Sequence, residues 1–362
     1  FPWVIDENIN KSADHFLKKY NQYFIKNKNN NLKKLNPVPK WGLWLEKGTV
    51  SFSSSLKELN IISDINNHTI NAMQASMSLG SWKPISMRDL FDIEYWELEQ
   101  AKLKKQNKLD EFQGKISIVT GAGNGIGYAS AKNLLEKGSI VVGLDKNKKI
   151  NSIFKDYNNF FGYHCDLIKS SQIRKIISKI ILDFGGIDIL VSNAGMFPQS
   201  EKLEKIDDQQ WSSGIDFNLK THHNIIRECI PFLKLGYQPS IVIVGSRNVG
   251  APGPGAGTYS ISKSGLTQMA RLAAIELSNN GIRVNVVHPD CVYDTKIWTK
   301  QILHSRAKEY GLTIDEYKNK NLLKKEVLSS DVAETIVFLA SSKSGKTTGA
   351  QIPIDGGNIR II

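Results

Sequence analysis

The chain has 362 residues, a length that suits two domains. Of these residues 41% are hydrophobic and 23% charged, a composition typical of folded proteins. No apolar run approaches the roughly 18 residues that a membrane span requires. The first residues also lack the basic head and apolar centre of a signal peptide. We therefore expect a cytoplasmic protein with no membrane partner. Because the sequence begins at Phe1 and not at Met, we also expect that the native N-terminus lies further upstream or was processed away.

The net charge of +12 raises the question of nucleic-acid binding. The lysines are scattered and no aromatic-basic motif accompanies them, so we expect a solvated basic surface and no nucleic-acid partner. Cys165, Cys229 and Cys291 are odd in number and lack CxxC spacing, which argues against disulfides and favours a reducing compartment. No HExxH or His-x-His ligand pair occurs, so we expect no metal.

Residues 1–109 mix polar helical stretches with one short extended run, and this pattern predicts a small α/β region. The apolar spacing predicts helices over residues 12–27 and 55–77 and an extended segment over residues 37–46. A charged segment over residues 91–112 is expected to form a helix and a linker into the second region.

Residues 113–362 show repeated alternation of apolar strands and amphipathic helices. Continuous apolar strands alternating with helices indicate a parallel sheet covered on both faces. We therefore expect an α/β fold with a doubly wound (Rossmann) sheet of about seven strands and a ligand at their carboxyl ends. The seven runs are residues 116–120, 139–145, 160–166, 187–193, 240–246, 282–289 and 351–355.

The first run leads into the glycine-rich segment TGAGNGIG, residues 120–127. Its glycines allow a tight turn and a close approach to a pyrophosphate, and the helix that follows favours phosphate at its N-terminus. The next strand ends in Asp145, whose carboxylate can accept the adenosine ribose hydroxyls and would repel a 2'-phosphate. NAD is thereby favoured over NADP, although Lys146 follows directly. The alternatives are a plain strand-to-helix turn for the glycines and a turn residue for Asp145.

Tyr259 and Lys263 lie four residues apart on one face of a predicted helix, and Ser246 lies thirteen residues before Tyr259. A phenol has a pKa of about 10, and we expect the Lys263 ammonium to lower the pKa of Tyr259. Tyr259 could then take the proton from a substrate alcohol while hydride leaves its carbon, with Ser246 bonding the same oxygen. A Tyr with a Lys four residues later is common by chance, so the combination with Ser246 and the glycine turn carries this interpretation.

With these motifs, and with CDL at residues 165–167 and SNAG at residues 192–195, residues 113–362 resemble the short-chain dehydrogenase/reductase family. One departure is Ser192, where the family usually has Asn. The resemblance implies that Lys263 also binds the nicotinamide ribose and that Asn218 holds a water linking Lys263 to solvent. It implies a dimer or tetramer formed through the helices that carry Asn218 and Tyr259. The implied catalytic residues are Ser246, Tyr259, Lys263 and Asn218, and the implied cofactor-binding residues are Gly121, Asn124, Gly125, Ile126, Gly127, Asp145, Asp166, Leu167, Asn193, Ala194, Gly195, Tyr259, Lys263, Pro289 and Val292.

Three further features accompany these motifs. The run HPDCVYDT departs from the family's PGxxxT, with Asp290 in place of Gly and Thr295 one place late. The segment from Lys296 to residue 327 is predicted to be a substrate lid, in which Trp298 is either a substrate wall or internal packing. His222 and His223 are expected to face a helix surface or a partner subunit.

A finer resemblance joins HTINAM and DLFDIEYWELEQAKL of the first region to SRNVGAPGPGAG, HPDCVYDTKIWT and KTTGAQIPIDGGN of the second. Together these segments resemble bifunctional rhamnulose-1-phosphate aldolase/short-chain dehydrogenase proteins. The resemblance implies that residues 1–109 are the tail of a class II aldolase domain plus linker, with the rest upstream and no aldolase activity in this chain. It also implies oxidation of lactaldehyde to lactate in the breakdown of rhamnose. The alternatives are an NAD-dependent sugar or polyol dehydrogenase and a non-catalytic nucleotide-binding scaffold.

Overall fold

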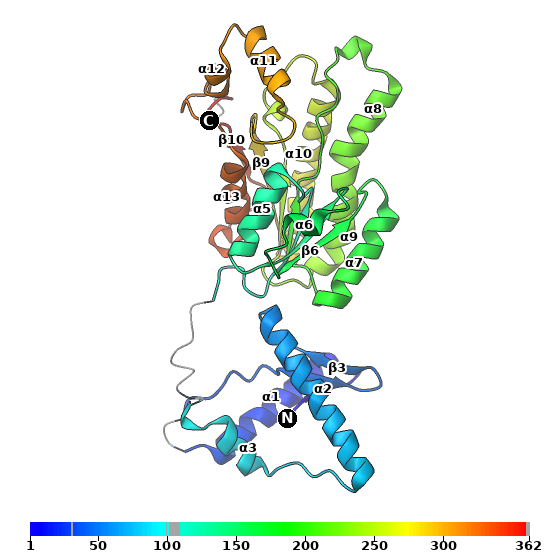
Figure 1. Cartoon of the computed structure of the whole chain (residues 1–362), viewed down its shortest axis with the longest axis vertical. Coiled ribbons are helices and arrows are strands. Elements are labelled where there is room, and N and C mark those ends of the chain that lie inside the picture. Colours follow the sequence, from blue (N-terminus) through cyan, green and yellow to red (C-terminus); the bar gives the residue numbers. More distant parts are fainter. Residues whose placement is uncertain (30–31, 99, 101–108, 360–362) are drawn as a thin grey trace. The chain divides into compact units, whose positions relative to one another are not determined.

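The computed structural model describes residues 1–29, 32–98, 100 and 109–359 and divides the chain into two compact units, Phe1–Leu109 and Asp110–Ile362 (Figure 1). Residues 99 and 101–108 of the predicted helix and linker lie outside the described residues. No helix among the described residues is both long enough and apolar enough to cross a membrane.

The first unit is a small α/β structure with a three-stranded sheet in the order β1-β2-β3. Strand β1 pairs parallel with β2, and β2 pairs antiparallel with β3. Aromatic side chains of α1 and α3 form its core, where the hydroxyl groups of Tyr20 and Tyr95 lie 2.8 Å apart. The two predicted helices are confirmed, whereas strands β1 and β3 were not predicted. The elements are β1 (Trp3–Ile5), α1 (Ile9–Asn27), β2 (Trp41–Trp44), β3 (Gly48–Ser51), α2 (Leu56–Leu79) and α3 (Met87–Glu94).

The second unit is a seven-stranded, entirely parallel sheet in the order β10-β9-β8-β7-β4-β5-β6. The predicted doubly wound sheet is therefore confirmed, and each of the seven predicted runs contains one strand. The order reverses between β4 and β7, which is where ligands bind in such sheets. The strands are β4 (Ile116–Thr120), β5 (Ile140–Asp145), β6 (Phe160–His164), β7 (Ile189–Ser192), β8 (Ser240–Val244), β9 (Arg283–Pro289) and β10 (Gln351–Ile354).

Helices cover both faces of this sheet, because strands buried on two faces need an apolar layer on each. Helices α5 and α13 contribute to one apolar core, and α7, α9 and α10 contribute to the other. The helices and short helical turns are α5 (Gly125–Glu136), α6 (Ile150–Ile153), α7 (Ser170–Phe184), η1 (Leu203–Lys205), α8 (Asp208–Ile215), η2 (Asp216–Lys220), α9 (Thr221–Leu233), η3 (Arg247–Val249), α10 (Gly257–Leu277), η4 (Ser278–Asn280), α11 (Lys300–Glu309), α12 (Ile314–Lys318), α13 (Ser329–Ala340) and η5 (Ser342–Ser344).

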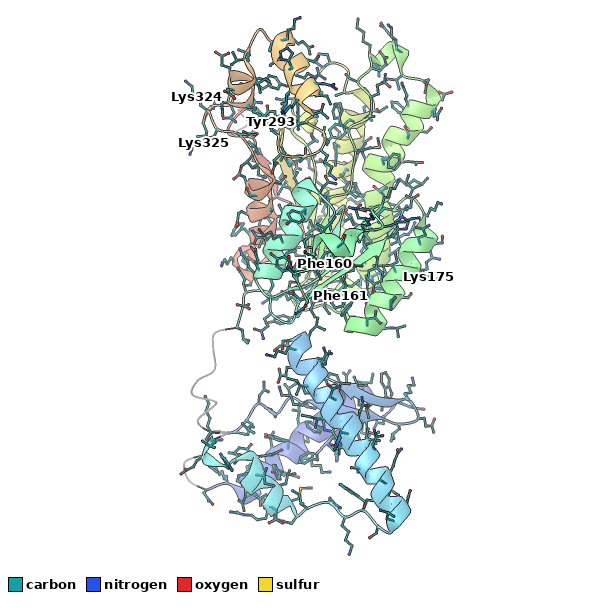
Figure 2. All side chains as sticks on the ribbon, in the orientation of Figure 1. Phe160, Phe161, Lys175, Tyr293, Lys324 and Lys325 are labelled. Carbon is teal, nitrogen blue, oxygen red and sulfur yellow. The ribbon has the colours of Figure 1, made fainter. Side chains whose placement is uncertain are left out.

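The insertion between β9 and α13 folds into its own small cluster, which contains α11 and α12. Tyr293, Leu303, Ala307 and Tyr317 are buried there, with Trp298 packed against them. Figure 2 labels Tyr293 and, after α12, Lys324 and Lys325 in this part of the unit, while Phe160 and Phe161 mark strand β6. The segment predicted as a lid is therefore a folded element.

Candidate functional site

The turn between β4 and α5 is shaped to admit a nucleotide pyrophosphate. Gly121 and Gly125 have φ of +66° and +54°, a backbone conformation that side chains disfavour. A Cβ atom on Gly127 would lie 2.1 Å from the Gly121 carbonyl oxygen, so the helix can start this close to the strand only with glycine there. The side chain of Asn124, which precedes α5, does not cap the helix. The amide groups at this helix N-terminus are thus free to meet phosphate oxygens, and the turn fits a dinucleotide.

The carboxylate of Asp145 lies at the end of β5 beside this turn. Its Oδ2 accepts a 2.8 Å hydrogen bond from the Gly123 amide, and its Oδ1 accepts one from the Asn147 amide. The ammonium nitrogen of Lys146 lies 3.4 Å from Asp166 Oδ1. The same nitrogen lies over the ring of Phe217. The basic residue after Asp145 is therefore engaged elsewhere.

The SNAG segment follows strand β7 and contacts the end of strand β4. The amides of Asn193 and Ala194 donate to Thr120 Oγ1 at 2.8 and 2.9 Å, and the Asn193 side chain donates to the Thr120 carbonyl. The Asn193 amide nitrogen would also lie 2.9 Å from a Cβ on Gly121. The structure therefore joins the two predicted cofactor segments directly.

The expectation that His222 faces a surface or a partner is wrong. His222 is buried on α9, where its Nδ1 lies 2.7 Å from Ser192 Oγ. It points inward because α9 packs its Thr221, His222 and Ile225 face toward the sheet. Burial, and then the charge of Lys263, hold the pKa of His222 well below its ordinary value, so the ring is neutral. Ser192 and His222 thus form a buried polar pair, while His223 is exposed as expected.

Asn218 lies fully buried in η2, a single turn of π-helix between α8 and α9. Such turns are rare overall and are frequent at functional sites. Its Oδ1 accepts from the Met196 amide at 3.0 Å, and its Nδ2 donates to the Gly214 carbonyl. A Cβ atom on Gly195 would lie 3.0 Å from Asn218 Oδ1 and 3.6 Å from Lys263 Nζ. Three predicted site residues therefore meet at one point.

Lys263 is buried on α10, with its ammonium nitrogen donating to the Val244 carbonyl at 2.8 Å. Burial lowers the pKa of Lys263 to about 7. The nitrogen lies 5.8 Å from the centroid of the Tyr259 ring, one helical turn earlier. Lys263 and Tyr259 thus share one face of α10.

The expected lowering of the Tyr259 pKa is not observed in the structure. Burial is the largest effect and raises the pKa of Tyr259, while a hydrogen bond with Ser246 lowers it in part. Lys263 is itself buried with a pKa of about 7, so it carries only a partial charge at neutral pH. Because the Asn248 amide donates to Ser246 Oγ at 3.2 Å, the hydroxyl proton of Ser246 remains available to the Tyr259 oxygen.

The segment after β9 lies against the start of α5. Pro289 ends the strand opposite Ile354, and the carbonyl of buried Val292 accepts from Thr295 Oγ1 at 2.9 Å. Thr295 itself approaches the glycine turn, since a Cβ on Gly125 would lie 2.9 Å from its methyl group. The structure therefore brings this segment to the predicted nucleotide turn.

Sequence reasoning missed two neighbours of Ser246, Tyr259 and Lys263, which we call the triplet. The ring centroids of Phe197 and Tyr259 lie 4.9 Å apart. Arg247 Nε lies 2.9 Å from Asp290 Oδ1. The Asp290 departure from the family pattern was the available signal for the second pair. Trp298, which was left open, contacts Tyr293 and Tyr317 within the lid cluster, which favours internal packing.

A hollow of about 610 Å³ lies beside the loop between Ser246 and Tyr259. Its lining includes Pro252, Pro254 and Ser260 but none of the three triplet residues. We therefore do not assign it to the chemistry. Within the described part of the chain, no group of three or more His, Cys, Asp or Glu side chains could hold a metal ion.

Comparison with known proteins supports this arrangement of motifs. Residues 121–358 match the family model described as enoyl-(acyl carrier protein) reductase, and residues 4–103 match that of the second domain of class II aldolases. An uncharacterized oxidoreductase of Bacillus subtilis, YuxG, is 29% identical over 96% of this chain, but the chain spans only 52% of YuxG.

Two further relatives match the second unit. The 3-oxoacyl-[acyl-carrier-protein] reductase of Thermotoga maritima is 33% identical and is matched over 98% of its length and 68% of this chain. Carveol dehydrogenase from Mycobacterium avium, solved in complex with NAD, is 25% identical with a TM-score of 0.64, over 70% of this chain and all of that one. The chain belongs to the short-chain dehydrogenase/reductase family of NAD(P)-dependent oxidoreductases, and its first unit resembles part of a class II aldolase.

Proposed function

We propose that this protein uses NAD to oxidise lactaldehyde to lactate in the breakdown of a deoxy-sugar such as rhamnose. The observation that carries the oxidoreductase part is the meeting of Ser246, Tyr259 and Lys263 beside a turn that fits a dinucleotide. The choice of lactaldehyde rests on the resemblance to aldolase-linked dehydrogenases. The match of residues 4–103 to a class II aldolase domain supports it.

The preference for NAD over NADP rests on Asp145. Its carboxylate lies at the glycine turn, 2.8 Å from the Gly123 amide, where a 2'-phosphate would meet a negative charge. Lys146 would offset this charge if it faced the same place, but it pairs with Asp166. We propose that Asp145 and Asp166 hold the adenosine end, and that the SNAG segment, Pro289 and Val292 surround the nicotinamide end.

Tyr259 acts as the general base in this proposal. A hydrated aldehyde is a gem-diol, and one of its hydroxyl groups loses its proton to Tyr259 while Ser246 donates a hydrogen bond to the same oxygen. Bound NAD supplies the acceptor for the hydride that leaves the same carbon. The diol carbon thereby becomes the carboxyl carbon of lactate. Burial opposes deprotonation of Tyr259, and we propose that the hydrogen bond with Ser246 and the charged form of Lys263 offset this effect, while Asn218 connects Lys263 toward solvent.

Cys291 does not serve as a nucleophile in this scheme. Burial, assisted by the neighbouring Asp290 carboxylate, raises the pKa of Cys291 to about 12, so the thiol is protonated at neutral pH. A protonated thiol is a weak nucleophile toward an aldehyde. The oxidation therefore proceeds through the hydrate and Tyr259 and not through a thiohemiacetal.

The first unit is proposed to be the tail of an aldolase domain with its linker, which would place lactaldehyde formation next to its oxidation. The self-association implied by the family is proposed to use α9 and α10. On α10, Ile261, Leu272 and Ile275 are exposed, as an interface of that kind requires.

A steady-state screen with NAD tests the proposal. Lactaldehyde, propane-1,2-diol and free deoxy-sugars are compared by NADH formation, and lactate is assayed as the product. We expect the highest kcat/KM with lactaldehyde. A higher value with a sugar or polyol would favour a secondary-alcohol dehydrogenase, and NAD binding without turnover would favour a scaffold.

A further inference from the structure

A buried ion pair joins the loop after Ser246 to the segment after β9. Arg247 Nε lies 2.9 Å from Asp290 Oδ1, and the two side chains are 22% and 8% exposed. Asn358 donates from its side-chain amide to the other oxygen, Asp290 Oδ2. Asp290 is thus held from two sides and cannot turn away from Arg247.

This pair leaves hydrogen-bonding groups unused. Asp290 Oδ1 has a charge partner in Arg247, but the N–H is not aligned with it, and the buried oxygen accepts no hydrogen bond. Neither Nη atom of Arg247 has a hydrogen-bond partner within the described residues. The Asp290 oxygen is enclosed, whereas the Nη donors of Arg247 keep some exposure and can reach a ligand.

The unused groups lie beside the proposed base. Arg247 directly follows Ser246, whose hydroxyl bonds Tyr259. On the other side, Asp290 precedes Cys291, which is close enough to Tyr259 to raise its pKa. A substrate with its reacting carbon at Tyr259 can therefore present a neighbouring group to Arg247.

We propose that Arg247, held in place by Asp290, donates a hydrogen bond to a neutral hydroxyl group on the carbon next to the reacting carbon, and so selects 2-hydroxy aldehydes and vicinal diols. The hydroxyl group accepts from an Nη donor of Arg247, while Asp290 fixes the guanidinium group through Nε. A carboxylate or phosphate would lie against the buried Asp290 charge. The inference deepens the proposed function and rests on it, because it assumes that Tyr259 marks the reacting carbon.

The test compares lactaldehyde with propanal, which lacks only the 2-hydroxyl group. The main variant is the double substitution Arg247→Met with Asp290→Asn, since removing both charges leaves neither one buried alone. We expect kcat/KM for lactaldehyde to fall by about 10- to 100-fold, the value of a hydrogen bond to a charged group, while that for propanal changes less than about threefold. Arg174→Met on α7, which removes an exposed arginine that pairs with Glu228, is the matched control and should change neither value.

Each alternative outcome has a distinct reading. An equal loss with both aldehydes, with NAD affinity and thermal stability retained, would show that the pair only positions the two loops and would overturn the inference. Faster turnover of a phosphorylated 2-hydroxy aldehyde, raised further by Asp290→Asn alone, would make this an anion site and would also overturn it.

A second substrate pair separates this inference from the proposed function. If neither aldehyde reacts but propane-1,2-diol is oxidised, the lactaldehyde assignment is wrong. The same variants are then compared on propane-1,2-diol and propan-2-ol, where loss of the diol preference supports the hydroxyl site. Inertness toward all four compounds would overturn both proposals.

Discussion

The buried lysine of the triplet should make the stability of the dehydrogenase unit rise with pH. Burial lowers the pKa of Lys263 from its ordinary value of 10.5 to about 7 in the folded chain. Between these values the unfolded chain binds a proton that the folded chain does not, so the free energy of unfolding increases as the pH rises. From pH 7 to pH 9 the increase due to Lys263 is about 2 kcal/mol, because each pH unit is worth about 1.36 kcal/mol here.

Urea unfolding at pH 7, 8 and 9, followed by far-UV circular dichroism, measures this increase. The transition of the dehydrogenase unit is the one that added NAD shifts in the wild type. Lys263→Met removes the titrating group but retains the other ionisable groups, so the wild type should gain about 2 kcal/mol more than the variant over this range. Equal pH slopes for the two proteins would show that Lys263 is not titrating in this range and would refute the reasoning.

Two further predictions concern the cofactor. Gly127→Ala places a methyl group 2.1 Å from the Gly121 carbonyl oxygen, so NAD affinity measured by fluorescence titration should fall by at least about tenfold, whereas Gly186→Ala, which meets no atom within 4 Å, should leave it unchanged. A normal affinity in Gly127→Ala would contradict the fit of this turn. Asp145→Ser removes the carboxylate beside Gly123, and we expect the ratio of kcat/KM with NADP to that with NAD to rise about 10-fold or more; an unchanged ratio would mean that Asp145 does not set the preference.

Most of the dehydrogenase fold could be predicted from local sequence patterns. The run over residues 116–120 is apolar throughout because β4 is buried on both faces, and its observed bounds match the prediction. The glycines at 121, 125 and 127 could be located for the same reason, since only a sharp strand-to-helix turn needs them at that spacing. Strand β1 was missed because three residues are too few to show a period.

The parts of the site that were not predicted depend on packing between distant segments. The Ser192 and His222 pair requires the orientation of α9 against β7, which no local pattern reveals. The raised pKa of Tyr259 follows from burial, which outweighs the hydrogen bond with Ser246, and burial at a single position depends on the whole fold. Arg247 and Asp290 are 43 positions apart and meet only because β8 and β9 are neighbours in the sheet. The assigned roles of the site residues stay predictions until they are measured.

The most direct test of the proposed function is lactaldehyde oxidation by the wild-type chain and by Tyr259→Phe, with NADH and lactate both quantified. We predict equal amounts of NADH and lactate from the wild type. In Tyr259→Phe we predict a loss of about 10²-fold or more in kcat with NAD affinity retained, because the variant keeps the ring but lacks the base. Full activity in Tyr259→Phe, or NADH formation without lactate, would contradict the proposal.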